Sequence, residues 1–270
     1  MKKDVKFTVL YNKEISGGNW LIRFKPVEKL EERFIKSISA GQFCEVSLGL
    51  SDPLLRRPFG IVRVGSEGEI DLSYKVVGKG TEIMTEFYEG KMVKILLPLG
   101  NKFKFFENKK AIIVVGGIGV APTIKLIEEL KARKSEIYYF YGASNKENLI
   151  FAEEIKKNVT EMYIATDDGS AGEKGFITNQ FQKFITEKNA ELSDYVMYAC
   201  GPTPLLMTLS DISKIKKIES YLSFESKMAC GFGLCAGCAI KVKDKENDFK
   251  YVRVCKEGAI FKGSEVMYEY

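Results

Sequence analysis

Three cysteines and three glycines are crowded into residues 230–238 of this chain. Cys230, Cys235 and Cys238 follow the spacing C-x4-C-x2-C, and a fourth cysteine, Cys255, lies beyond a segment that is typical of a hairpin. This spacing is that of plant-type [2Fe–2S] sites, in which one loop wraps the cluster and a distant thiolate closes it. Glycines suit such a loop because they adopt positive φ and let backbone N–H groups turn toward sulfur.

A structural zinc site with four cysteine ligands is the alternative interpretation. Such sites usually carry two C-x2-C pairs, whereas the first pair here is spaced by four residues, so the spacing favours the cluster. The chain contains no histidine, which excludes a Ser-His-Asp triad, a Rieske cluster and a His-ligated haem. Its chemistry therefore depends on cysteine or on a bound cofactor. Cys44, in a predicted strand, is expected to be a buried small hydrophobe.

Two glycine-containing turns predict a nucleotide site. In "VVGGIGVAPTIKL", Gly116, Gly117 and Gly119 stand where a strand gives way to a helix, an arrangement that lets a phosphate approach the backbone. Plain close packing of the turn is the alternative. "YACGPTPLLM" ends a later strand in the same way, so both turns are expected at the carboxyl edge of one sheet. "TDDGS" ends the strand between them, and its Asp167 favours NAD over NADP, although a solvated turn explains it nearly as well.

A second pair of motifs lies in the first hundred residues. Arg56 and Arg57 precede a proline and a strand in "LLRRPFGIV", and could hold a pyrophosphate. Gly78, Gly80 and Thr81 precede a short predicted helix and could supply backbone donors. A surface ion pair is the alternative for the arginines.

The hydrophobic pattern changes once along the chain. Up to about residue 100, six strand-length segments separated by glycine, proline and serine turns predict a small antiparallel barrel. From about residue 110, strands alternate with amphipathic helices, which predicts a doubly wound parallel sheet. We therefore expect an α/β plus all-β protein with a barrel at residues 1–102, an α/β domain at 103–220 and a small cysteine module at 221–270.

Composition limits the partners. Hydrophobic residues make up 45% and charged residues 29% of the 270 positions, as in soluble globular proteins. The net charge of +5 comes from 41 basic and 36 acidic residues that are well interspersed, so nucleic acid and anionic membranes are not expected partners. No apolar segment is long enough for a signal peptide or a membrane span, and a cytoplasmic protein is predicted.

The order of the motifs adds a family resemblance. "RRPFG", "VVGKGT", "GGIGVAP", "ACGP" and the terminal cysteine motif occur in the order seen in the ferredoxin–NADP reductase superfamily. Over essentially the whole chain, "TDDGSAGEKGF", "SKMACGFGLCAGC" and "RVCKEG" resemble the electron-transfer subunits of class B dihydroorotate dehydrogenase. That resemblance implies an FAD-binding barrel, an NAD-binding domain and a [2Fe–2S] module.

The resemblance also implies residue roles. The FAD-binding residues would be Arg57, Pro58, Phe59, Gly60, Tyr74, Lys75, Val76, Gly80 and Thr81. The NAD-binding residues would be Gly117, Gly119, Val120, Ala121, Asp167, Cys200, Gly201 and Pro202, with Cys200 near the nicotinamide. The cluster ligands would be Cys230, Cys235, Cys238 and Cys255.

The expected activity is that of an oxidoreductase subunit serving pyrimidine (UMP) biosynthesis. Electrons would pass from the FMN of a separate dihydroorotate-oxidising subunit through the cluster and FAD to NAD+, in an assembly with two copies of each subunit. The chain shows no second flavin domain and no candidate dihydroorotate pocket of its own.

Two features separate the chain from relatives. Gly60 stands where the family usually has Ser or Thr, whose hydroxyl reaches the reactive flavin nitrogen. The alternative function is the small subunit of another flavin and iron–sulfur NAD(P)H oxidoreductase, of the ferredoxin or polysulfide reductase type. That group tends to have aspartate at the position of Cys230, so the cysteine favours the dihydroorotate assignment.

Overall fold

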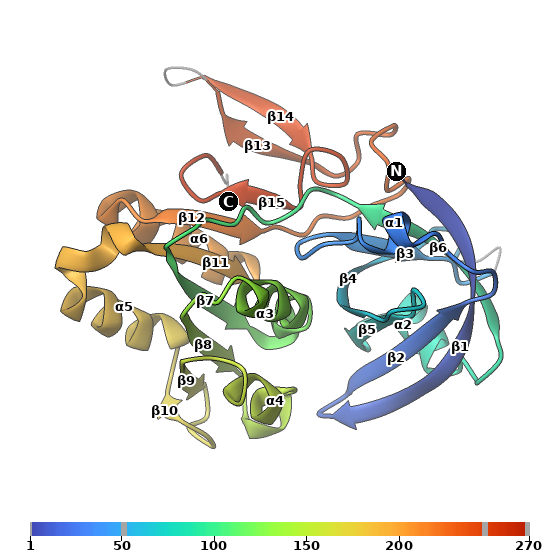
Figure 1. The fold of residues 1–270 in the computed structure, drawn as a ribbon, viewed down its shortest axis with the longest axis horizontal. Coiled ribbons are helices and arrows are strands. Elements are labelled where there is room, and N and C mark those ends of the chain that lie inside the picture. The colour runs from blue at the N-terminus through green and yellow to red at the C-terminus, as the bar shows by residue number, and fades with distance from the viewer. Residues whose placement is uncertain (1, 50–52, 245–247, 268–270) are drawn as a thin grey trace.

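The N-terminal strands close into a barrel in the computed structural model, which describes residues 2–49, 53–244 and 248–267. The barrel is at the right of Figure 1, and its antiparallel order is β1-β2-β5-β4-β3-β6. Its elements are β1 (Lys3–Ser16), β2 (Asn19–Pro26), α1 (Glu32–Ile35), β3 (Phe43–Val46), β4 (Arg57–Val64), β5 (Ile70–Lys75), α2 (Lys79–Thr85) and β6 (Met92–Leu99). Alternate side chains, among them Phe7, Phe24, Leu72 and Ile95, fill the interior. The predicted barrel is confirmed.

A seven-stranded sheet of order β10-β9-β8-β7-β11-β12-β15 forms the second unit. All its pairings are parallel except that of β15 with β12. Its strands are β7 (Lys110–Gly116), β8 (Ile137–Ala143), β9 (Glu161–Thr166), β10 (Glu173–Lys174), β11 (Tyr195–Cys200), β12 (Glu219–Ser223) and β15 (Ile260–Lys262). The order reverses between β7 and β11, which places a ligand crevice at their carboxyl ends.

Helices cover both faces of this sheet. The helical segments are η1 (Gly117–Val120), α3 (Thr123–Ala132), η2 (Lys146–Asn148), α4 (Ala152–Lys156), α5 (Ile177–Glu187), η3 (Asn189–Asp194) and α6 (Thr203–Lys216). On β7, Ile113 and Val115 pack with α3 and α4, whereas Ile112 and Val114 pack with α5 and α6. This alternation is the two-sided burial that a doubly wound sheet requires, and it confirms the prediction.

The sequence patterns missed or overextended some elements. The apolar pattern of residues 148–158 predicts a helix, but only the five-residue α4 forms, because Phe151 adopts a left-handed backbone (φ 60°) that interrupts it. The strands β12 and β15 were not anticipated. β12 spans the predicted boundary at residue 220, and β15 returns from the cysteine-rich segment to pair with it.

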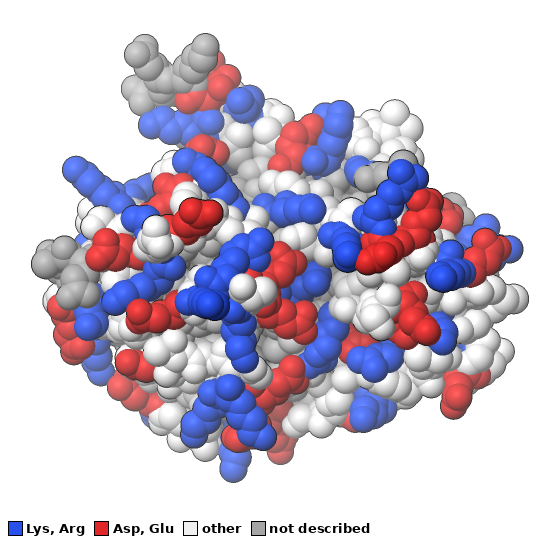
Figure 2. Space-filling view, viewed as in Figure 1, with Lys and Arg blue, Asp and Glu red and all other residues white. Residues whose placement is uncertain are grey.

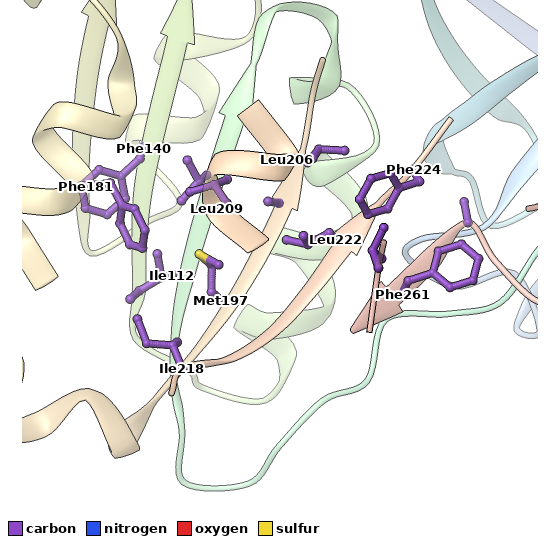
Figure 3. Close-up of a cluster of buried hydrophobic side chains, with 14 of the residues drawn as sticks. Ile112, Phe140, Phe181, Met197, Leu206, Leu209, Ile218, Leu222, Phe224 and Phe261 are labelled. Carbon is purple, nitrogen blue, oxygen red and sulfur yellow. The ribbon is translucent and has the colours of Figure 1, made fainter. Parts of the chain in front are cut away.

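The C-terminal segment shares the core of the sheet. It contains the hairpin β13 (Ala239–Lys243) and β14 (Phe249–Arg253), which projects at the top of Figure 1. Figure 3 shows Phe261 near Phe224, in a cluster that continues to Leu222, Met197 and Phe140. The same core includes Cys238, Val254 and Cys255. The cysteine-bearing segment is therefore packed against the α/β unit.

Surface charge is mixed. Basic and acidic side chains alternate over the face shown in Figure 2, in keeping with the even balance in the sequence. Among the residues described, no helix is both long and apolar enough to span a bilayer.

A carboxylate on α3 joins the barrel to the α/β unit. Glu129 accepts hydrogen bonds from the Ser39 hydroxyl (2.8 Å to Oε2) and from the Ala40 N–H (2.8 Å to Oε1). Ala40 also accepts from the N–H of Phe103, in the segment between the two units. These contacts fix the barrel loop that leads into β3 against α3.

Replacing Glu129 with alanine should lower the free energy of unfolding by about 1–3 kcal/mol, because two barrel donors lose a charged acceptor. Glu173→Ala is the control, since it removes only an exposed ion pair with Lys183 and should cost about 0.5 kcal/mol or less. Denaturant titration of the two flavin-loaded variants measures the difference. Equal losses in both would contradict the prediction.

Candidate functional site

A cavity of about 380 Å³ lies between the barrel and the α/β unit. We call it the barrel-side cavity. Most of the residues predicted to bind FAD line it, namely Arg57, Pro58, Phe59, Gly60, Tyr74, Lys75 and Thr81. Val76 is outside the lining and 40% exposed. Gly80 is buried beneath Arg57, since a Cβ there would lie 2.3 Å from the arginine Nε.

Aromatic rings form one wall of the barrel-side cavity. Tyr74 is buried, and its ring stacks on Trp20 with centroids 6.2 Å apart and lies 6.1 Å from Phe59. Its hydroxyl donates to Asn12 Oδ1 at 3.0 Å. Burial raises the pKa of Tyr74 to about 12, so the phenol stays neutral. A wall of this kind suits a large planar heterocycle.

The turn before α2 is held by Thr81. Its hydroxyl accepts from the N–H groups of Val77 (2.9 Å) and Gly78 (3.2 Å) and donates to the Gly78 carbonyl. The hydroxyl is therefore committed to the loop. Arg57, on the same cavity, supplies positive charge for an anionic group there.

The structure explains the glycine at position 60. A Cβ on Gly60 would lie 2.9 Å from Pro122 Cβ, at the start of α3. A Ser or Thr would therefore push the barrel away from the α/β unit. The departure from the family pattern follows from this close contact between β4 and Pro122.

A second cavity, of about 820 Å³, lies at the carboxyl ends of the parallel strands. We call it the sheet-side cavity. Its lining includes five of the residues predicted to bind NAD, which are Gly117, Gly119, Asp167, Gly201 and Pro202. Ala121 and Cys200 line the barrel-side cavity, and Val120 is fully buried and lines neither. Burial raises the pKa of Cys200 to about 12, which keeps it a thiol.

The turns after β7 and β11 touch through their backbones. A Cβ on Gly119 would lie 2.6 Å from the carbonyl oxygen of Cys200 and 2.7 Å from the nitrogen of Gly201. A Cβ on Gly201 would lie 2.9 Å from the nitrogen of Gly116. Side chains at these positions would force the strands apart, so the glycines form a cradle at the point where the strand order reverses.

The two cavities share one wall. Lys75, Ile118, Gly119 and Glu225 line both, so ligands in the two cavities meet there. Sequence patterns did not single out Glu225, because the strand that ends just before it was not predicted. Desolvation raises the pKa of its carboxyl above the usual range.

Two more lining residues reach the cavity through contacts between segments that are far apart in the sequence, and no sequence pattern marked them. Asn19 on the barrel and Asn148 of the α/β unit both line the sheet-side cavity. The Asn148 Oδ1 atom accepts from Asn19 Nδ2 and from Lys75 Nζ, each at 3.2 Å. These bonds join the barrel to the α/β unit at the cavity wall.

The four predicted ligand cysteines lie together in two pairs. Cys238 and Cys255 are buried, with sulfurs 3.2 Å apart. Cys230 and exposed Cys235 form the second pair, in which the N–H of Cys235 donates to Cys230 Sγ at 3.5 Å. No three acidic or cysteine side chains in the described residues surround a single point. Two pairs of thiolates fit a binuclear cluster, which takes two ligands on each iron.

Backbone donors already point at the sulfurs. The N–H of Leu234 donates to Cys230 Sγ (3.3 Å), that of Gly237 to Cys235 Sγ and that of Cys255 to Cys238 Sγ. Burial opposes ionisation of Cys230, but the N–H groups of Cys235, Phe232 and Leu234, with the Cys235 side chain, outweigh it and lower the pKa of Cys230 to about 6. The loop is thus built to stabilise negative charge on sulfur.

Comparison with known proteins agrees with this geometry. The family described as the iron-sulfur cluster binding domain of dihydroorotate dehydrogenase B matches residues 225–267, and the oxidoreductase NAD-binding domain family matches residues 113–211. The electron transfer subunit of dihydroorotate dehydrogenase B (NAD(+)) from Caldanaerobacter subterraneus is 33% identical over 99% of this chain and all of its own length. That of Bacillus pumilus is 35% identical over 98% of both chains. The chain belongs to this family of electron-transfer subunits.

Membership makes the chain a component of an oxidoreductase that works with FAD, a [2Fe–2S] cluster and NAD. The prediction of an iron–sulfur cluster in place of zinc is thereby confirmed. A homologue of the family from Aquifex aeolicus is 32% identical over 99% of this chain. A solved structure of the NADH-dependent reduced ferredoxin–NADP oxidoreductase, 25% identical, superposes with a TM-score of 0.82 over 97% of this chain and 89% of its own.

Gly119→Ala should weaken NADH binding by about tenfold or more, because the added methyl strains the turn that both cavities share by roughly 1–3 kcal/mol. The KM for NADH in dye reduction reports this effect. Flavin content is measured in the same samples, and activity is expressed per bound flavin, because Gly119 also lines the barrel-side cavity. An unchanged KM would show that the close approach at Gly119 does not shape the site.

Proposed function

We propose that this chain carries electrons from a dihydroorotate-oxidising catalytic subunit to NAD+ in the cytoplasm, for pyrimidine (UMP) biosynthesis. The observation that carries the proposal is the shared wall between the barrel-side and sheet-side cavities, combined with four paired thiols on the same chain. When bound, FAD links the two-electron exchange of a nicotinamide with the one-electron exchange of a [2Fe–2S] cluster.

The residues of the chain have distinct tasks in this proposal. Tyr74 and Phe59 hold the flavin ring, and Arg57 neutralises its pyrophosphate. The glycine cradle at Gly119 and Gly201 admits the nicotinamide half of NAD to the shared wall. Buried Cys200 excludes water there as a neutral thiol. Cys230, Cys235, Cys238 and Cys255 ligate the cluster.

The partner is an FMN-bearing catalytic subunit, with two copies of each subunit in the assembly. The name "electron transfer subunit" in the relatives implies a catalytic partner subunit, which supports the proposal. On this chain, Phe232 (48% exposed) and Leu234 (79%) precede exposed Cys235 on the cysteine loop. Apolar side chains presented beside a redox centre suit a docking surface that excludes water and shortens the electron-transfer distance.

A second candidate function is the small subunit of another flavin and iron–sulfur NAD(P)H oxidoreductase. It is favoured by the likeness to the NADH-dependent ferredoxin–NADP oxidoreductase structure. Co-purification decides between the two. The first function predicts an FMN-bearing partner and dihydroorotate-dependent reduction of NAD+ by the pair. A ferredoxin-reducing complex without dihydroorotate activity would support the second.

Cys235→Ser should abolish dihydroorotate-dependent NAD+ reduction by the two-subunit complex, because one cluster ligand is lost, while NADH oxidation by a dye that accepts from FAD is spared. Stopped-flow absorbance measures the two activities, and iron analysis measures the cluster content. Cys44→Ala is the matched control, since Cys44 is buried in the barrel outside the cysteine loop, and it should keep both. Full coupled activity in Cys235→Ser would refute the relay.

Asp167→Ser should lower the preference for NAD over NADP by about tenfold, since a carboxylate facing the sheet-side cavity repels an added 2′-phosphate. Asp168→Ser is the control. The Asp168 carboxylate is bound within its own turn by the N–H (2.9 Å) and hydroxyl (2.6 Å) of Ser170. Ratios of kcat/KM for the two coenzymes measure the change, and equal effects of both substitutions would contradict the assignment.

A further inference from the structure

A buried carboxyl group on the barrel has no hydrogen-bond partner within the described part of the chain. Glu45, on β3, is 0% exposed, and neither Oε1 nor Oε2 is bonded. Its neighbours across the sheet are Pro58 on β4 and Leu96 on β6. An unsatisfied buried polar group costs about 1–3 kcal/mol, so its presence points to a role other than packing.

The carboxyl faces the cysteine loop. A Cβ built on Gly231 would lie 2.2 Å from Glu45 Oε2 and 2.3 Å from Cδ, so the carboxyl fills the space that a side chain at position 231 would need. Gly231 follows the ligand Cys230 directly and has a φ of 71°. Glu45 thus reaches from the wall that carries the flavin motif Arg57–Gly60 to the start of the cluster loop.

Positive groups contact the loop at Gly233, two residues beyond Gly231. Arg253 Nη1 donates to the carbonyl of Gly233 at 2.7 Å. The aliphatic part of Lys256 packs on Gly233, because a Cβ there would lie 2.6 Å from Lys256 Cδ. On the barrel side, Arg56 is the cation that acts on Glu45, but two hydrogen bonds of 2.8 Å tie its guanidinium to Asp4. The loop therefore contacts a carboxyl group at Gly231 and two basic residues at Gly233, of which Arg253 is ion-paired with Glu257.

We propose that Glu45 is a positioning residue that lowers the reduction potential of the cluster and so directs its electron toward the flavin. The inference rests on the proposed function. Reduction adds one negative charge to the cluster, and a carboxylate on the loop wall in a poorly solvated site opposes that charge. One electron enters from the partner subunit and one leaves to the flavin, with no bond made or broken in this chain.

The test is a redox titration of the cluster in the full, cofactor-loaded chain, monitored by electron paramagnetic resonance. Burial raises the pKa of Glu45 to about 7, so the buffer is alkaline to keep the carboxyl ionised. Glu45→Gln keeps the shape of the side chain and removes its charge, so the cluster midpoint potential is expected to rise. The FAD potential, read from visible absorbance of the same sample, should move less. Lys256→Gln removes a charge of opposite sign beside the loop and should lower the cluster potential.

A cluster potential in Glu45→Gln that equals or falls below that of the unmodified protein overturns the proposal. Glu45→Met provides a second neutral side chain of similar length, with the same expected rise. If neither neutral variant retains iron but Glu45→Asp does, the carboxyl serves loop assembly, and the proposed control of potential is wrong. If none of the three retains iron, the carboxyl acts through loop structure alone, and the proposed control of potential is wrong in that case too.

These outcomes are separable from failure of the proposed function. The titration needs only the iron and flavin of the isolated chain, whereas the proposed function fails if the two-subunit complex does not couple dihydroorotate to NAD+. A chain with a normal cluster and a Glu45-dependent potential, but with no dihydroorotate activity in the complex, would keep this inference and redirect the partner assignment.

Discussion

The backbone contact between Gly119 and the end of β11 is the constraint on which the rest of the structure depends. Because no side chain intervenes, the turn after β7 lies against Cys200 and Gly201, and the barrel-side and sheet-side cavities share a wall. A hydride donor and its acceptor must be in contact, so in the proposed function this shared wall is where transfer is expected. The fold therefore fixes the relative position of the two cavities in which the nicotinamide and the flavin are proposed to bind.

That geometry survives only if the barrel cannot move relative to the sheet. Contacts that hold it include the Glu129 carboxylate on the barrel loop, the packing of Pro122 against Gly60, and the ion pair of Arg63 with Glu154 at 2.5 Å. The Asn148 bonds to the barrel add to them. Gly60 lies at this joint, and its close packing leaves no room for the Ser or Thr hydroxyl that the flavin motif usually carries.

Local patterns in the sequence were sufficient for the main elements and for the cysteine set. Strand alternation predicted the barrel, and helix periodicity predicted the α/β unit, because both depend on burying one face of each element. The spacing of the cysteines was sufficient to predict an iron–sulfur cluster. The misses have long-range causes: β15 is three residues long and exists only through its pairing with β12, and Glu225 and Asn148 reach the cavity wall through contacts between distant segments. The left-handed break at Phe151 left no sign in the hydrophobic pattern.

The pairing of β15 with β12 also determines how the protein responds to truncation of its C-terminal segment. An uncovered β12 would display free backbone N–H and C=O groups together with the apolar face of Leu222, a template for self-association. The cysteine-bearing C-terminal segment therefore also covers the edge strand of the sheet. Removing that segment by proteolysis or truncation would expose β12 and favour aggregation of the subunit. The same segment is therefore needed both for electron transfer and for keeping the subunit from aggregating.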